Sequence, residues 1–291
     1  MAGDDDMIEF LQRAMGYTLT GKTGDQCLFF THGNGANGKS VFLEILLQLT
    51  GEYGTNSRAD SFMVKQSGGI PNDIARLVGM RFVGVNETET GQRMAESLVK
   101  DLTGGDTITA RFLHREFFTF RPGFKLWIRG NHKPNIRGTD DGIWRRIHLI
   151  PFEVQIPEAE RDPDLPERLR AELSGILRWA VDGAIRWQRD GLRVPEKVKA
   201  ATSEYRTEMD RLADFIAEKC TTGSSFSAFA GNLYKSYTSW CDESGEQHPM
   251  SQTAFGLALT ERGYRKVKSD GRNKYMGIGL NVSDYRERHY G

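Results

Sequence analysis

The chain has 291 residues, more than one compact domain usually needs, and this length predicts a core of ordinary size plus a smaller second unit. Its 39 basic and 39 acidic residues balance, which excludes a global attraction to nucleic acid or membranes, so contact with a polyanion requires a local basic patch. The three cysteines lie far apart without metal-ligand spacing, no apolar run approaches the roughly 20 residues that span a bilayer, and the first residues lack the basic start of a signal peptide. We therefore expect a cytoplasmic protein with reduced cysteines.

The first predicted element is a short helix over residues 7–16 that Gly16 closes. It is too small to bury its apolar side alone, so we interpret it as the tail of a longer upstream element. The apolar run 27–32 then predicts a strand, and the apolar spacing of residues 41–49 predicts a helix.

A phosphate-binding loop lies between that strand and that helix. Its residues match the pattern G-x-x-x-x-G-K-[ST] and are Gly33, Asn34, Gly35, Ala36, Asn37, Gly38, Lys39 and Ser40. Glycines let backbone N–H groups turn toward phosphates, Lys39 supplies charge to the β and γ oxygens, and the Ser40 hydroxyl can ligate Mg²⁺. The alternative is a glycine-rich surface turn, but the strand and helix on either side favour binding of ATP with Mg²⁺.

Two polar residues follow the next predicted strands. In phosphate-loop ATPases, a carboxylate at the end of a neighbouring strand holds Mg²⁺ or orients the attacking water. Glu87 follows the strand predicted over 81–86 and suits this role, unless it is an ordinary solvated loop residue. Asn131 follows the strand predicted over 124–130, where it can bond the γ-phosphate or the lytic water, or instead begin the turn before Pro134.

The remaining elements of the first half complete a layered sheet. Residues 91–101 have helical composition, residues 107–120 predict a hairpin with a polar tip at 113–116, and residues 146–151 predict another strand. Strands that alternate with helices around a phosphate loop predict an α/β sheet with ligands at its carboxyl edge.

The second half is mostly helical, and its pattern restarts near residue 208. Residues 165–191 predict a helix that Gly191 ends, and Pro195 opens another. After a Ser/Thr/Gly stretch at 221–227, helices are expected over 232–240 and over 251–262, the latter with Ser251 as N-cap, and two short β runs follow. This order is that of a winged helix-turn-helix.

A basic cluster occupies the two final β runs. Between residues 262 and 274 the only acid is Asp270, and the basic residues that we expect to contact DNA are Lys266, Lys268, Arg272 and Lys274. The alternative is a charged, solvated edge on a domain that docks to protein.

Five runs together resemble a known family. Residues 33–40, 79–87, 100–111, 131–136 and 142–147 are similar, in this order, to the superfamily 3 helicase module of phage and plasmid primase-helicases, which are related to poxvirus primase-helicase. The resemblance implies an AAA+-like P-loop NTPase core that assembles as a homo-oligomeric ring, commonly a hexamer, and moves 3′ to 5′ along single-stranded DNA. It also implies the end of a helical collar at residues 1–24, the ATPase at 25–207, a winged-helix domain at 208–291, an upstream primase domain, and the host cytoplasm as location if a phage encodes the chain.

The resemblance assigns roles to single residues of the nucleotide site. Lys39 and Ser40 correspond to the phosphate loop, Glu87 to the acid of the second motif, and Asn131 to the polar sensor. Asn86 departs from the pattern, because many AAA+ relatives have an acid there. Mg²⁺ would then be held by Ser40, Glu87 and water.

The resemblance also implies a DNA grip and a shared active site. Residues 104–120 correspond to a hairpin that projects into the ring channel, with His114 and Arg115 at its tip on the DNA phosphates and Arg111 either joining them or bracing the hairpin. Arg145 and Arg146 lie where the family keeps an arginine finger that reaches the neighbouring subunit's γ-phosphate. Spacing does not identify which of the two is the finger, and one can instead pair with an internal carboxylate.

The leading hypothesis is therefore an ATP-driven DNA helicase that acts on single-stranded or forked DNA. A second hypothesis is a DNA-binding replication initiator or loader in which ATP acts as an assembly switch. A third is a monomeric small-molecule kinase, which shares the phosphate loop but lacks the paired arginines and the basic hairpin.

Overall fold

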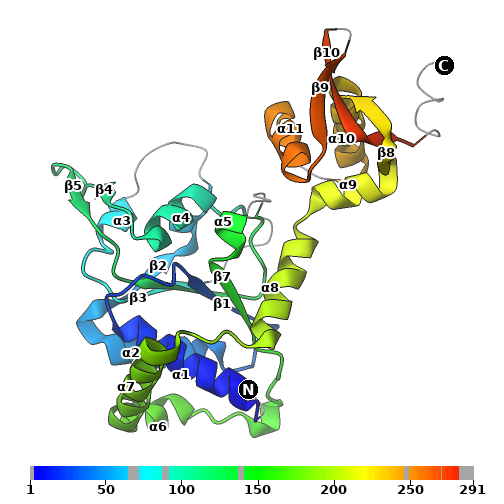
Figure 1. Ribbon diagram of the computed structural model, residues 1–291. Helices are drawn as coiled ribbons and strands as arrows, with labels where there is room; N and C mark the ends of the chain where they lie inside the picture. Colours follow the sequence, from blue (N-terminus) through cyan, green and yellow to red (C-terminus); the bar gives the residue numbers. More distant parts are fainter. Residues whose placement is uncertain are drawn as a thin grey trace. The chain divides into compact units, whose positions relative to one another are not determined.

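The computed structural model describes residues 3–64, 72–86, 92–136, 141–245, 249–269 and 271–281 (Figure 1). The chain divides into two compact units, Met1–Thr207 and Glu208–Gly291. Within the described ranges, no helix is both long and apolar enough to cross a membrane.

The first unit alternates strands and helices along the chain. Its helices are α1 (Asp5–Leu19), α2 (Lys39–Thr50), α3 (Asn72–Ala75), α4 (Glu96–Gly104), α5 (Asp141–Trp144), α6 (Leu165–Ala171), α7 (Leu173–Asp190) and α8 (Glu196–Glu208). Its strands are β1 (Leu28–His32), β2 (Gly54–Arg58), β3 (Phe82–Asn86), β4 (Ile108–Ala110), β5 (Phe118–Phe120), β6 (Lys125–Gly130) and β7 (Ile147–Pro151).

Five of these strands form a parallel sheet in the order β2-β3-β6-β1-β7. The inner strands are almost wholly buried, which explains why they occur as near-continuous apolar runs in the sequence. Helices α1, α2 and α7 lie on one face of the sheet and α4 and α5 on the other (Figure 1). The prediction of an α/β sheet is confirmed, and the predicted hairpin is present as β4 paired antiparallel with β5.

Helix α1 packs along α7 at two glycines, and this contact corrects one prediction. The helix does not end at Gly16 but continues to Leu19. A Cβ on Gly16 would lie 2.1 Å from the Ala184 nitrogen, and a Cβ on Gly183 would lie 2.0 Å from the Gln12 oxygen. Gly16 therefore serves the close approach of two helices rather than a helix end.

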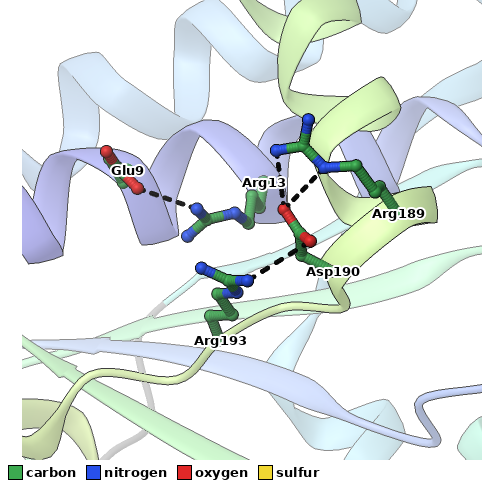
Figure 2. A network of polar contacts seen from close by, with 5 residues as sticks. All are labelled: Glu9, Arg13, Arg189, Asp190 and Arg193. Carbon is green, nitrogen blue, oxygen red and sulfur yellow. Dashed lines mark hydrogen bonds and ion pairs between the residues drawn. The ribbon is translucent and has the colours of Figure 1, made fainter.

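Polar groups surround one end of this helix pair (Figure 2). Arg13 on α1 bonds Glu9 at 2.7 Å, and Asp190 at the end of α7 pairs with Arg189 at 2.8 Å and Arg193 at 3.2 Å. The guanidinium groups around Asp190, first that of Arg189, lower the pKa of this carboxyl. Each of these ion pairs has one largely exposed partner and is screened by solvent, so its contribution to stability is small.

The helix predicted over 165–191 is also corrected, because it is two helices, α6 and α7, with a break at Glu172. Pro166 stands in the first turn of α6, where proline is tolerated. Gly191 does end α7, with a φ of +71° that favours glycine.

The second unit contains three helices and three strands within its described residues. They are α9 (Arg211–Lys219), β8 (Cys220–Phe229), α10 (Ala230–Glu243), α11 (Gln252–Glu261), β9 (Arg265–Ser269) and β10 (Arg272–Leu280), and the antiparallel sheet has the order β8-β10-β9. Tyr237, Trp240 and Phe255 lie in its core, and Ser251 caps α11 by accepting a bond from the Ala254 N–H at 3.3 Å. The Ser/Thr/Gly stretch at 221–227, for which no element was predicted, lies within strand β8.

Candidate functional site

The phosphate loop lies at the carboxyl edge of the sheet, between β1 and α2. Four of its residues have a positive φ, which is +157° at Gly33, +92° at Gly35, +48° at Ala36 and +84° at Gly38. At Gly33 a Cβ would lie 2.2 Å from the Phe152 oxygen, so glycine is required for this close approach. The loop geometry therefore depends on its glycines at defined positions.

Lys39 is folded back onto this loop. It is only 4% exposed, and its Nζ donates to the Gly33 oxygen at 2.6 Å and to Asn37 Oδ1 at 3.0 Å. No side chain caps the start of α2, whose first turn also has no acidic residue. Uncapped N–H groups beside a buried ammonium fit the phosphates of a nucleotide.

The loop borders a cleft of about 310 Å³. Its walls come from the loop, from the segment after β7 and from α8, and its residues are His32, Gly33, Asn34, Gly35, Asn37, Lys133, Leu149, Pro151, Phe152, Glu153, Gln155, Ala201 and Glu204. Asn37 Nδ2 donates to the Phe152 oxygen at 2.7 Å, and the Ile156 N–H donates to the Ala36 oxygen at 2.7 Å. These two bonds fix the loop to the segment after β7. This wall was not predictable from the sequence, because its residues carry no recognisable motif.

Asn131 is placed beside the loop by the order of the strands. β6 pairs in parallel with β1, and Gly130 stands opposite His32. The next residue on each side is Asn131 after β6 and Gly33 after β1, so these two residues are neighbours at the sheet edge. Neighbouring strands lie about 4.8 Å apart. An exposed Asn131 side chain at this position is within reach of a group bound at the loop.

The candidate metal ligands are described only in part. Ser40 is exposed in the first turn of α2, whereas Glu87 lies outside the described residues, directly after the last residue of β3. Among the described residues, no group of three or more His, Cys, Asp or Glu side chains could hold a metal. Mg²⁺ commonly binds through one or two protein oxygens together with substrate phosphates, and Ser40 fits that mode of binding.

The two arginines point in different directions. Arg146 is buried, 8% exposed, and its Nε donates to Thr103 Oγ1 at 3.2 Å while its guanidinium also contacts the Gly142 oxygen. Arg145 is exposed, and its guanidinium donates to Gln26 Oε1 at 3.1 Å. Arg145 is thus the arginine that can reach another molecule.

Arg145 lies far from the phosphate loop of its own chain. The Leu28 N–H donates to the Arg146 oxygen at 2.7 Å, so the arginine pair lies beside the amino end of β1. The loop begins at the other end of this five-residue strand, about 13 Å away at the usual rise per residue. The structure therefore does not bring Arg145 together with Lys39.

The β4–β5 hairpin projects from the first unit (Figure 1). His114 and Arg115 are both exposed at its tip, and His114 has a left-handed φ of +61°. Arg111 lies 4.9 Å above the ring of Phe117, a contact that braces the hairpin. The tip is also apolar, which its polar sequence at 113–116 did not predict, because Phe112, Leu113 and Phe117 are 42%, 70% and 57% exposed.

The basic residues of the second unit do not share one face of the sheet. Lys266 and Lys268 pair across the ladder with Tyr275 and Asn273, whereas Arg272 and Lys274 pair with Ser269 and Val267. Because directly paired residues point to the same side, these two sets lie on opposite faces. Arg272 and Lys274 both lie 5.8 Å from the ring of Phe229 and form a compact basic and aromatic cluster.

Two family models match different parts of the chain. Residues 31–146 match a family described as a family of unknown function (DUF5906), and residues 207–280 match a family described as Poxvirus D5 protein-like. The first match includes the phosphate loop, the hairpin and both arginines, and the second covers most of the second unit.

The similar curated proteins come from large DNA viruses. The chain is 29% identical over 234 residues to a protein named "Putative helicase" from Acanthamoeba polyphaga mimivirus, a match that covers 74% of this chain and 24% of that protein. It is 26% identical over 257 residues to a protein of the same name from Frog virus 3 (isolate Goorha), covering 81% and 26%. It is 22% identical over 208 residues to a protein named "Putative primase" from African swine fever virus, covering 64% and 22%. The chain spans about a quarter of the length of the curated relatives that it matches.

Solved structures are similar across nearly the whole chain. The apo structure of the NrS-1 C-terminal region gives a TM-score of 0.55 at 14% identity and covers 95% of this chain and 72% of that chain. This likeness supports the fold, a mixed α/β structure with a parallel sheet as its core.

Proposed function

Because the chain is related to the superfamily 3 primase-helicases, we propose that it is the ATP-driven motor module of a viral replicative DNA helicase. The observation that carries this proposal is the presence, in one unit, of a complete phosphate loop and an exposed basic hairpin that projects from the fold. A nucleotide site supplies the energy, and a projecting basic element is suited to hold a polyanion.

In this proposal, the chain binds the triphosphate of ATP at the start of α2. Lys39 exchanges its bonds with the Gly33 oxygen and Asn37 for bonds with phosphate oxygens. Ser40, with Glu87, would hold Mg²⁺, which neutralises charge on the β- and γ-phosphates when bound. Asn131 and Glu87 orient the attacking water. The cleft beyond the loop accommodates the nucleoside.

The proposed active site is completed by a second copy of the chain. Arg145 lies beside the amino end of β1, whose length of about 13 Å separates that end from the loop, and it is exposed, so we assign it to the γ-phosphate of the neighbouring subunit. Sites shared in this head-to-tail manner close into a ring when the rotation between subunits permits. In the ring, His114 and Arg115 hold the phosphates of single-stranded DNA and move it 3′ to 5′ as ATP is hydrolysed.

We assign the remaining parts in the same proposal. The second unit, with its helices α10 and α11 followed by the β9–β10 ribbon, is a winged-helix domain whose basic ribbon contacts DNA. Helix α1 is the end of a helical collar. A primase segment belongs elsewhere in the full-length protein, because the chain spans only a quarter of its relatives and one of them is named a primase.

A second candidate is an ATP-switched replication initiator or loader, which the basic and aromatic cluster on the second unit favours. Such a protein would bind DNA and hydrolyse ATP without displacing a strand.

The test combines ATP hydrolysis with strand displacement on a forked DNA. We expect single-stranded DNA to stimulate hydrolysis and ATP to drive unwinding. His114→Ala/Arg115→Ala should bind nucleotide normally but lose at least ten-fold in unwinding, because the exposed hairpin tip loses its phosphate contacts. Arg178→Ala/Arg186→Ala, which removes two exposed charges on α7, is the matched control and should unwind like the wild type.

Three outcomes would decide against parts of this proposal. Hydrolysis without unwinding by the wild type would favour the loader. Hydrolysis that DNA does not stimulate would argue for a small-molecule kinase. Full unwinding by His114→Ala/Arg115→Ala would reject the hairpin assignment.

A further inference from the structure

Gln26 joins the exposed arginine to the root of the hairpin. Its Oε1 accepts from Arg145 at 3.1 Å, and its Nε2 donates to the Gly104 oxygen at 3.1 Å. Both ends of one carboxamide are therefore engaged, each by a different segment of the chain. Gln26 has a φ of +49°, an uncommon conformation for a residue other than glycine.

The Gly104 oxygen stands where α4 ends and the path to the hairpin begins. Gly105 follows with a left-handed φ of +83°, and β4 starts three residues later at Ile108. A Cβ on Gly105 would lie 3.7 Å from Thr23 Oγ1, so the segment that carries Gln26 also packs against this turn. A change in the contacts of Gln26 would thus alter the position of the turn that leads into β4.

The buried arginine contacts the same turn. Arg146 Nε donates to Thr103 Oγ1 at 3.2 Å, and its guanidinium lies 3.6 Å from the position of a Cβ on Gly104. Both arginines are therefore connected to the end of α4. Arg146 contacts it directly, and Arg145 is linked to it through Gln26. Arg146 fixes the end of α4, while the contact through Gln26 is partly exposed and can be exchanged.

We propose that Gln26 is a positioning residue that links engagement of Arg145 with a neighbouring subunit's nucleotide to the position of the DNA hairpin. When Arg145 turns to the γ-phosphate, Gln26 Oε1 loses its donor, the carboxamide reorients, and the bond from Nε2 to the Gly104 oxygen is released. Gly105 gives the turn the backbone freedom to move. The hairpin root then has one position with Arg145 withdrawn and another with Arg145 engaged. This inference rests on the proposed function.

The chemistry requires an amide at this position. A glutamate has the same length and accepts from Arg145, but its carboxylate cannot donate to the Gly104 oxygen. It would also hold Arg145 by an ion pair and oppose its engagement with the neighbouring subunit's γ-phosphate. An alanine releases both partners.

The test compares Gln26→Glu and Gln26→Ala with the wild type in the full chain. The readout is the ratio of ATP turnover with single-stranded DNA to turnover without it, together with the melting temperature. Both variants should lose most of the DNA stimulation, so that the ratio falls close to one. Gln26→Glu should also lower turnover several-fold at low salt and recover part of it at high salt, because salt screens an exposed ion pair.

Gln48→Ala is the matched control, since Gln48 is also an amide that bonds an arginine, Arg170, on the surface of the first unit. It should keep the wild-type ratio. A wild-type ratio in folded Gln26→Glu and Gln26→Ala would overturn the inference and leave the proposed function intact. Absence of DNA stimulation in the wild type would instead count against the proposed function. Gln26→Glu is nearly isosteric, so the test stands even if the alanine variant does not fold.

Discussion

At the scale of single residues, His148 illustrates how burial sets charge. It lies on β7 with its ring 6.1 Å from that of Phe10 and 5.8 Å from that of Phe29. Burial in this aromatic environment disfavours the imidazolium and lowers the pKa of His148 to about 4. His148 is therefore neutral in the folded protein at pH 7.

This shift predicts a loss of stability in mild acid. Between pH 6.5 and about pH 4, His148 is protonated in the unfolded chain but neutral in the folded chain. As the pH falls through this range, the free energy of unfolding therefore decreases by up to about 1.4 kcal/mol per pH unit. His148→Asn removes this term, and the difference in melting temperature between wild type and variant should shrink from pH 7 to pH 5. Parallel decreases in the two proteins would contradict the prediction.

At the scale of elements, the contact between α1 and α7 depends on the absence of a side chain. Gly183→Ala places a methyl group 2.0 Å from the Gln12 oxygen, so the helices must separate. We expect a loss of about 1–3 kcal/mol in the free energy of unfolding, measured by urea titration. Gly175→Ala, on the same helix with nothing within 4 Å of its Cβ, should instead stabilise by up to about 1 kcal/mol. Equal effects of the two substitutions would show that helix propensity, rather than packing, dominates.

Elements were predictable where one local signal decided the structure. Buried parallel strands such as β1 and β6 occur as apolar runs, and the phosphate loop is a contiguous motif. β8 was missed because its Thr, Gly and Ser residues have no strand pattern of their own, and pairing with β10 imposes the conformation. Packing also carried α1 through Gly16, against the low helix propensity of glycine.

The candidate site was likewise predictable where a short run of sequence carries a local signal. The sequence led to the loop, the hairpin and the arginine pair, all of which occur in short runs. It could not distinguish Arg145 from Arg146, because their environments depend on Gln26 and Thr103, which are distant in the chain. Such contacts arise only from the tertiary fold.

At the scale of the whole molecule, the two ends of β1 have different proposed roles. The carboxyl end carries the phosphate loop, and the amino end lies beside the arginine pair. In the proposed ring, a single subunit would hold two half-sites that face different neighbours. ATP turnover would then be a property of the assembly.

Mixing two inactive variants tests this arrangement. Lys39→Ala loses the ammonium that holds the phosphates, and Arg145→Ala loses the exposed guanidinium, so each alone should have ATP turnover reduced by about 10³-fold or more. In mixed rings, a junction that takes its loop from an Arg145→Ala subunit and its arginine from a Lys39→Ala subunit is complete. Random assembly of equal amounts makes about a quarter of the junctions complete, so turnover should recover to that order.

The control replaces the Arg145→Ala partner with Lys39→Ala/Arg145→Ala, a mixture in which no junction has an intact loop and no activity should return. Subunit exchange is verified by the mass of the mixed particles. Recovery in the first mixture and none in the second would establish that Arg145 acts on the neighbour's nucleotide. Turnover that stays at the sum of the separate variants, in particles shown to be mixed, would place the action of Arg145 within its own subunit, in conflict with its location at the opposite end of β1 from the loop.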